Sequence, residues 1–339
     1  MRLLVKVSVI VSTHSMLRAE LLFSCISSLQ KQILQPEEIL LVLEPDRQLE
    51  EFYSSQLSGK VRVIVSSEGG LSSARNAGVR HARGDVVAFI DDDAVADKEW
   101  LRNLVMNYDD DDIVGTGGPV EPVWENGRPA WFPSTLDWIV GCTFDESPRE
   151  KELIRSPIGC NMSFRRRGFE VAGYFTTSLG RRNKSMIGSE ETEFCLRLYD
   201  AFPNARIVYD PTAIVHHWVP SSRANANYLI KRSFYEGYSK ALMTVEHSRS
   251  KALIPEKSYL RHLFLDQIPS CLRRIYKLDQ LQKLAVILLS LSSVLVGYAT
   301  FRIGSLFTKR NRGNTEGPLV SDKKLTGTIT SVTNQLAGI

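Results

Sequence analysis

The stretch VVAFIDDD, residues 86–93, joins an apolar run to three consecutive carboxylates. Its first five residues are apolar and rich in β-branched side chains, which predicts a buried strand. Alternate side chains of an extended chain share a face, so we expect Asp91 and Asp93 to point one way and Asp92 the other. Carboxylates at the mouth of an open α/β sheet suit a hard divalent cation that carries phosphates. For this stretch alone, the alternative is an acidic turn before the next helix, with Asp97 as its cap.

Three short apolar runs precede this stretch, and segments with helical spacing of apolar residues separate them. The order strand, helix, strand, helix, strand predicts a doubly wound α/β sheet with right-handed crossovers. The predicted strands are 5–12, 39–43 and 61–65, and the predicted helices are 18–32, 47–57 and, further along, 100–106.

The segment EGGLSSARNAG, residues 68–78, has the pattern of a glycine turn that opens a helix. Ser72 or Ser73 is expected to cap this helix, which would run to Gly84. Arg75 falls in the first turn, and a helix N-terminus with an arginine in its first turn can hold an anion. The alternative is an ordinary capped helix with Arg75 in solvent.

Composition and charge exclude several classes of protein. The formal net charge is only +4 over 339 residues, and no basic run is interleaved with aromatic residues, so we expect no binding to nucleic acid. The five cysteines form no C-x-x-C pair, which argues against a zinc site or a disulfide framework and favours a reducing compartment. The first residues resemble a strand rather than a signal peptide.

The second half of the sequence adds two candidate sites. In GSEETEFCLRL, residues 188–198, Ser189 is a plausible N-cap and the following acids suit the positive end of the helix dipole. A predicted strand at 208–215 ends in two histidines. A histidine beyond a strand end can complete a metal shell begun by Asp93. A histidine without a metal is the alternative.

Together these motifs resemble family 2 glycosyltransferases. SVIVSTHS, EILLVLE, GLSSARNAG, FIDDDA and GSEETEFCLRL occur in the family's order within residues 5–240. The resemblance implies a GT-A fold, a nucleotide-binding mixed sheet flanked by helices. It also implies inverting, metal-dependent transfer from a nucleotide-diphosphate sugar, most often UDP-linked. PAWFP, CNMSFRR and RSFYEGYSKA resemble the group that extends lipid-linked glycans, such as archaeal dolichyl-phosphate-sugar glucuronosyltransferases.

The resemblance assigns the donor site to four positions. Thr13 would touch the nucleotide base, and Glu44 would contact the base or ribose, although the family more often has aspartate there. Arg75 would lie beside the nucleotide. Asp91 would face the ribose or the phosphates.

The same resemblance assigns a metal site. Asp93 would ligate Mn²⁺ or Mg²⁺ between the two phosphates, and His217 stands in the register of a late histidine ligand. Asp92 would be a spectator. Three basic residues further on could meet a diphosphate or a lipid phosphate: Arg223, Arg232 and Lys240.

The base and the acceptor site follow from two further motifs. The family has Glu-Asp where this chain has Glu190-Glu191, and the second acid is the general base, so Glu191 takes that role with a side chain one methylene longer. Such a carboxylate would deprotonate the acceptor hydroxyl as it attacks the anomeric carbon. Glu190, Asn161 and Met162 would line the acceptor pocket.

The C-terminal part has the composition of a membrane-associated segment. Residues 256–283 form an amphipathic, basic pattern that suits an anionic membrane surface, with a core-facing helix as the alternative. Residues 284–301 carry no charge, which predicts one transmembrane helix rather than a buried one, with a hairpin-like or interfacial segment as a further alternative. The tail is polar and predicted to be disordered. The predicted domains are 1–240 (catalytic), 241–304 (membrane-associated helices) and 305–339 (tail).

The predicted enzyme is thus a single-pass cell-membrane protein whose catalytic domain faces the cytoplasm, where nucleotide sugars are made. Its partners would be a nucleotide-diphosphate sugar, a lipid-linked or other glycan acceptor, and the membrane. A nucleotidyltransferase is one alternative, but it would need a glycine-rich loop after the first strand, where this chain has STHSMLR. A catalytically inactive sugar-nucleotide-binding scaffold is the other alternative.

Overall fold

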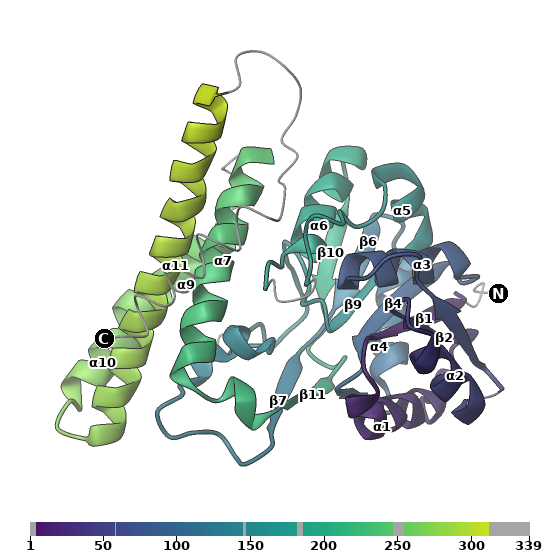
Figure 1. Cartoon of the computed structure of the whole chain (residues 1–339), viewed down its shortest axis with the longest axis horizontal. Helices are drawn as coiled ribbons and strands as arrows, with labels where there is room; N and C mark the ends of the chain where they lie inside the picture. The colour runs from purple at the N-terminus through teal and green to yellow at the C-terminus, as the bar shows by residue number, and fades with distance from the viewer. Residues whose placement is uncertain (1–4, 58, 145–146, 182–185, 247–253, 312–339) are drawn as a thin grey trace. The chain divides into compact units, whose positions relative to one another are not determined.

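A mixed sheet forms the centre of the protein in the computed structural model, which describes residues 5–57, 59–144, 147–181, 186–246 and 254–311 (Figure 1). The eight strands lie in the order β3-β2-β1-β4-β9-β6-β10-β8. The first four neighbours are parallel, and β9 runs antiparallel between β4 and β6. The predicted mixed α/β sheet is therefore confirmed. The strands are β1 (Val7–Thr13), β2 (Glu38–Leu43), β3 (Val61–Val65), β4 (Val86–Asp91), β6 (Ile113–Gly117), β8 (Glu152–Leu153), β9 (Asn161–Arg165) and β10 (Arg206–Tyr209).

Helices cover both faces of this sheet, so both sides of its central strands are buried. Val9 and Val11 of β1 belong to one hydrophobic core, and Ile10 between them belongs to the other. This explains why β1 reads as one continuous apolar run. The helices of this part are η1 (Met16–Arg18), α1 (Ala19–Gln30), α2 (Arg47–Gln56), α3 (Leu71–His81), α4 (Trp100–Met106), η2 (Asn107–Asp109), α5 (Arg166–Ala172) and α6 (Glu190–Ala201).

The start of α3 differs from the prediction. Gly70 is its N-cap residue, with φ 111°, so the helix begins before the serines that were expected to cap it. Ser72 instead donates from its hydroxyl to the carbonyl of Leu179 at 2.7 Å. Glycine suits this position because φ in that range is rare for residues with a Cβ.

The predicted strand at 208–215 is also wrong, because two strands occupy this region. Pro211 cannot donate to a strand ladder, and Asp210 accepts hydrogen bonds from the backbone and hydroxyl of Thr212 in a turn. The chain then enters β11 (Val215–Val219) in a second sheet of order β5-β11-β7. Its other strands are β5 (Ala94–Ala96) and β7 (Val120–Trp124), and the 3₁₀ helices η3 (Ser134–Val140) and η4 (Ser221–Arg223) lie nearby in the sequence.

The C-terminal part is helical. It contains α7 (Ala226–Glu246), α9 (Ile254–His262), the π-helical turn η5 (Leu263–Gln267), α10 (Ile268–Arg273) and α11 (Leu278–Asn311). Among the described residues, one helix is long and apolar enough to cross a membrane, from Leu278 to Leu306. It continues to Asn311, so the predicted disorder from residue 305 is wrong for 305–311, and 312–339 lie outside the described residues. The chain divides into two compact units at Phe301; the predicted domain boundaries stay predictions.

Helices α7 and α11 run parallel and in close contact. The hydroxyls of Ser233 and Ser290 are hydrogen-bonded at 2.9 Å, and further along both helices a Cβ on Gly237 would overlap the carbonyl oxygen of Val294. A Cβ on Gly297 would likewise overlap the carbonyl oxygen of Phe234. The two backbones therefore touch through small residues, as tightly packed helices do.

We predict that Gly297→Ala lowers the free energy of unfolding by about 1–3 kcal/mol, because the new methyl group collides with backbone rather than with a movable side chain. Gly304→Ala in the same helix is the matched control, since nothing lies within 4 Å of a Cβ there. Thermal unfolding in detergent compares the two. Equal melting temperatures would contradict the close α7–α11 contact.

Candidate functional site

The candidate site lies at the carboxyl end of β4, beside β1. Strand β1 pairs with β2 on one side and with β4 on the other, and Ser12 lies opposite Asp91 in the register. Connections from these strands leave in opposite directions, which opens a crevice where ligands bind in doubly wound sheets. The acidic triplet was expected at such a crevice, and the structure places it there.

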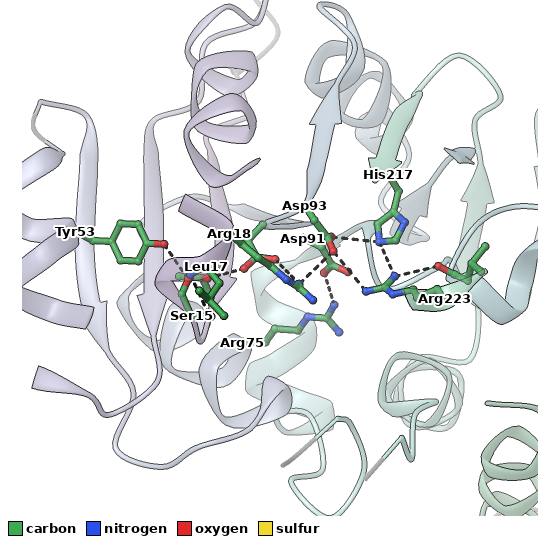
Figure 2. Close-up of polar contacts among 12 residues, drawn as sticks. Ser15, Leu17, Arg18, Tyr53, Arg75, Asp91, Asp93, His217 and Arg223 are labelled. Carbon is green, nitrogen blue, oxygen red and sulfur yellow. Dashed lines mark hydrogen bonds and ion pairs between the residues drawn. The ribbon is translucent and has the colours of Figure 1, made fainter. Parts of the chain in front are cut away.

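The small sheet brings Asp93 and His217 together. Strand β5 follows the acidic triplet and pairs antiparallel with β11, so that Ala94 lies opposite His217. The backbone N–H of Trp218 donates to the carbonyl of Asp93 at 2.8 Å. As a result, Nε2 of His217 lies 3.2 Å from Oδ1 of Asp93, and both side chains are buried (Figure 2).

Two arginines also meet Asp93. Its Oδ2 lies 3.1 Å from Nη1 of Arg18 and 3.5 Å from Nη2 of Arg223 (Figure 2). Burial alone would raise the pKa of Asp93, but the hydrogen bond and charge of His217, followed by the two guanidinium charges, hold that pKa well below its ordinary value. Asp93 is therefore an ionised carboxylate.

The donor atoms around His217 fit a divalent cation. The side-chain ligand atoms of Asp91, Cys160 and His217 lie within 4.8 Å of one another, and Asp93 lies beside the same imidazole. Carboxylate oxygens and an imidazole nitrogen suit Mn²⁺, and the oxygens suit Mg²⁺. Burial raises the pKa of Cys160 well above its ordinary value, so its thiol stays protonated and is a poor ligand. The two aspartates and His217 therefore fit the metal.

Arg75 is buried beneath the site, so the alternative that placed it in solvent is wrong. It donates to Oε1 of Glu190 at 2.6 Å and to the carbonyl of Gly159 at 2.8 Å. It also lies 3.3 Å from Oδ1 of Asp91. Burial lowers the pKa of Arg75, but the charges of Glu190 and Asp91 outweigh that effect and raise it. The guanidinium thus ties α3, β4 and the start of α6 together.

Asp92 has structural contacts within the site, and its absence from donor and metal binding stays a prediction. Thr13 donates from its hydroxyl to Oδ2 of Asp92 at 2.5 Å, and Arg18 donates to Oδ1 at 3.1 Å. Burial, followed by the charge of Asp93, raises the pKa of Asp92. The hydroxyl of Thr13, which was predicted to touch the base, is thus hydrogen-bonded to Asp92 within the protein. Glu44, at the end of β2, accepts a hydrogen bond from the N–H of Gly70 at 2.8 Å and lies at the crevice.

Glu191 stands half-buried in the first turn of α6. Burial, and then the charge of Glu190, raises the pKa of Glu191 to about 8. Ser189 is the N-cap residue, but its side chain caps nothing and its φ is 76°, a left-handed conformation that costs on the order of 1–3 kcal/mol for a residue with a Cβ. The helix start is held in a strained conformation next to the candidate base.

Two predicted acceptor residues do not face the site. Asn161 is fully buried, donates to the carbonyls of Pro119 and Ala213, and accepts from the indole of Trp100 at 2.8 Å. Met162 is equally buried in the core. All polar atoms of the Asn161 side chain serve the fold, which speaks against acceptor contacts for this pair. Glu190 is bound to Arg75.

Sequence reasoning missed two residues of this site. Arg18 reaches both Asp92 and Asp93 from the turn after β1, and Cys142 places its Sγ 3.6 Å from Nδ1 of His217. The only signal for Arg18 was a basic residue shortly after the first strand, which is common. No pattern pointed to Cys142, because its contact depends on how η3 packs against β11.

Known proteins share this sequence and fold. The profile of glycosyl transferase family 2 matches residues 8–173. A glucosyl-dolichyl phosphate glucuronosyltransferase of Haloferax volcanii is 32% identical over 302 residues, covering 86% of this chain and 95% of the relative. The chain belongs to glycosyltransferase family 2. The succinoglycan biosynthesis protein ExoM of Rhizobium meliloti is 31% identical over 183 residues, 52% of this chain and 53% of that protein.

A solved structure supports the fold of this family 2 enzyme. The mannosyltransferase PcManGT of Pyrobaculum calidifontis, in complex with GDP-Man and Mn²⁺, superposes with a TM-score of 0.53 at 16% identity, covering 90% of this chain and 81% of that one. The GT-A expectation is confirmed by this likeness. The family assignment makes the chain a glycosyltransferase and favours sugar transfer over the nucleotidyltransferase and scaffold alternatives.

We predict that Arg75→Leu lowers the free energy of unfolding of this glycosyltransferase by about 3–5 kcal/mol, because it leaves the Glu190 carboxylate buried and uncompensated. Arg47→Leu is the control, since its pair with Glu51 is exposed and should be worth about 0–1 kcal/mol. Urea unfolding measures both. Similar losses for the two variants would show that Arg75 does not hold the site together.

Proposed function

We propose that this enzyme is an inverting, metal-dependent glycosyltransferase. It takes a sugar from a nucleotide-diphosphate donor, UDP-linked by preference, and adds it to a lipid-linked sugar or to a polyprenyl or dolichyl phosphate during glycan assembly. The observation that carries the proposal is the contact between Asp93 and His217, with Asp91 beside them, at the crevice of a GT-A sheet. The lipid-linked acceptor is supported by the printed name of the Haloferax volcanii relative.

The donor would lie across the crevice between β1 and β4. Glu44 and the turn after β1 would meet the base and ribose, and Asp91 would face the ribose or phosphates. Asp91, Asp93 and His217 would hold Mn²⁺ or Mg²⁺. When bound, the ion would neutralise charge that develops on the diphosphate leaving group. Arg75 fixes Asp91 from below through its 3.3 Å contact.

Glu191 would act as the base. The acceptor hydroxyl attacks the anomeric carbon from the face opposite the diphosphate, its proton passes to the Glu191 carboxylate, and the sugar–phosphate bond breaks with inversion. A raised pKa suits this task, since a base that titrates near the working pH accepts a proton readily. Glu190 is tied to Arg75, which leaves Glu191 as the carboxylate for proton transfer.

The enzyme would work at a membrane. Helix α11 is long and apolar enough to anchor it, and the catalytic part would face the cytoplasm, where nucleotide sugars are made. The single crossing by 284–301 that the sequence predicts is one form that this attachment could take.

The metal site is tested by nucleotide binding. We expect UDP to raise the melting temperature of the purified protein when Mn²⁺ is present, since a ligand at about 100 times its dissociation constant stabilises by about 2.7 kcal/mol. The same measurement with GDP, dTDP and CDP shows which nucleotide the site prefers. Asp93→Ala and His217→Ala should each remove the metal-dependent part of the shift. A shift that survives both substitutions would place the metal elsewhere.

The base is tested by kinetics. Glu191→Gln should reduce kcat by about 10²–10⁴-fold while leaving UDP binding intact, because it removes proton transfer and keeps the shape. For the wild type, kcat/KM should rise with pH and level off above about 8, since the carboxyl must lose its proton in the free enzyme. Glu190→Gln provides a comparison at the adjacent acid. Unchanged turnover in Glu191→Gln would remove Glu191 as the base.

A further inference from the structure

Helix α11 has two apolar faces. One face is buried inside the protein and carries Leu284, Ile287, Ser290, Ser293 and Gly297. The opposite face is exposed and carries large apolar side chains: Leu281, Leu288, Leu289, Leu295, Val296 and Ile303. No charged residue interrupts either face between 284 and 301. A helix that is apolar all round is normally covered on all sides, and here the described residues of the protein cover only one.

The buried face of α11 is fixed to α7 over a long distance. At one end of this contact, Leu229 of α7 and Ala285 of α11 line the same groove. At the other end, the rings of Tyr238 in α7 and Phe301 in α11 lie with their centroids 5.0 Å apart. These partners span 17 positions of α11, or about 25 Å along its axis. That length is most of the thickness of the hydrocarbon core of a bilayer, which is about 30 Å.

The other side of α7 faces the catalytic machinery and is charged. Arg232 and Lys240 pair with Glu236 at 3.0 and 3.3 Å, and Lys240 pairs with Glu256 at 2.8 Å. Ser239 accepts from the backbone N–H of Gly188 at 3.3 Å, in the segment that leads into α6. Glu236 is next to Gly237, which meets Val294, so these ion pairs are level with the middle of α11, and the segment before α6 is level with Phe301.

This arrangement is incompatible with a membrane crossing by α11. Crossing would carry the ion pairs of α7 and the irregular backbone before α6 into the hydrocarbon region. Charged side chains there cost several kcal/mol each, and unpaired backbone groups cost a similar amount.

The exposed apolar surface continues from α11 onto the preceding helices and is bordered by cations. Exposed apolar side chains on α9, η5 and α10 and in the turn before α11 are Leu260, Phe264, Leu265, Leu272, Ile275 and Tyr276. Basic residues accompany them: Arg261, Arg273, Arg274 and Lys277, all exposed. Apolar side chains beside lysine and arginine match the acyl and headgroup layers of an anionic bilayer.

A groove of about 200 Å³ links this surface to the catalytic part. It lies between α7 and α11, and its lining is apolar apart from one glutamine, with Trp131, Ala226, Leu229, Val286 and Leu289 among the residues that form it. Such a groove offers room for part of a hydrocarbon chain at the edge of the exposed face.

We propose that the surface formed by α9, η5, α10 and the exposed face of α11 lies in the plane of an anionic membrane, and that α11 does not cross it. One face of α11 packs on α7 and the other enters the lipid. The described C-terminal end, Asn311, then stays on the same side as the catalytic part. This replaces the single crossing predicted from the sequence, and it does not depend on which sugar or acceptor the site uses.

Topology is the first test. The full chain with a C-terminal tag is expressed in bacteria, and protease is added to sealed inside-out and right-side-out membrane vesicles. We expect the tag and the catalytic part to be cleaved in the same vesicle orientation, the inside-out one. Cleavage of the tag in one orientation and of the catalytic part in the other would demonstrate a crossing and overturn the proposal.

Vesicle flotation tests the surface itself. The purified full chain should float with vesicles that contain phosphatidylglycerol, bind less to pure phosphatidylcholine, and lose binding as salt rises. Leu288→Glu combined with Leu295→Glu should weaken binding by about tenfold or more, since each leucine is worth about 1.5–3 kcal/mol when buried. Leu153→Glu, on an exposed strand of the catalytic part, is the control and should float as the wild type does.

Two readings separate the possible outcomes. The UDP and Mn²⁺ melting shift, measured on each variant, shows whether the fold and the donor site survive, so failure of the membrane surface and failure of the sugar-transfer proposal are distinguishable. Unchanged flotation of the double variant would overturn the proposal. The proposal would also be overturned if the wild type formed a dimer in solution and the double variant a monomer with unchanged flotation, because the face would then be a contact between two copies.

Discussion

The pairing of β5 with β11 is the constraint on which the site depends. Three residues of β5 follow the acidic triplet directly, and their antiparallel ladder with β11 fixes His217 against Asp93. Without this ladder, the large sheet would present the carboxylates at the end of β4 without His217 beside them. A short second sheet, built from segments more than a hundred residues apart, therefore converts an acidic turn into a site that fits a metal.

The sequence predicted what local patterns control. Strand 61–65 and helix 100–106 match the structure to the residue, because periodicity and β-branched content act within a few residues. The partnership of Asp93 and His217 came from motif resemblance. Local pattern failed where distant packing decides: Asn161 lies in an acceptor-like motif, yet its amide is used to join β9 to two loops and Trp100. Arg18 was missed for the same reason, because its contacts with Asp92 and Asp93 join segments that are distant in the sequence.

The C-terminal helix shows a second limit of sequence patterns. Hydropathy measures how much apolar surface a helix carries. It does not show whether that surface packs against lipid or against protein. In α11 the small residues Ser290, Ser293 and Gly297 form the face that meets α7, while leucines form the opposite face. Reading small and large residues as separate faces would have indicated a helix held between two different environments.

The two guanidinium groups at Asp93 have a consequence for folding in the absence of the proposed metal ion. Arg18 and Arg223 already supply the positive charge that a buried carboxylate needs. The fold therefore does not wait for a metal, in contrast to small domains that collapse only around an ion. A newly made chain is therefore expected to reach its final shape without the proposed metal ion, and a chelating agent should stop the proposed sugar transfer without unfolding the protein.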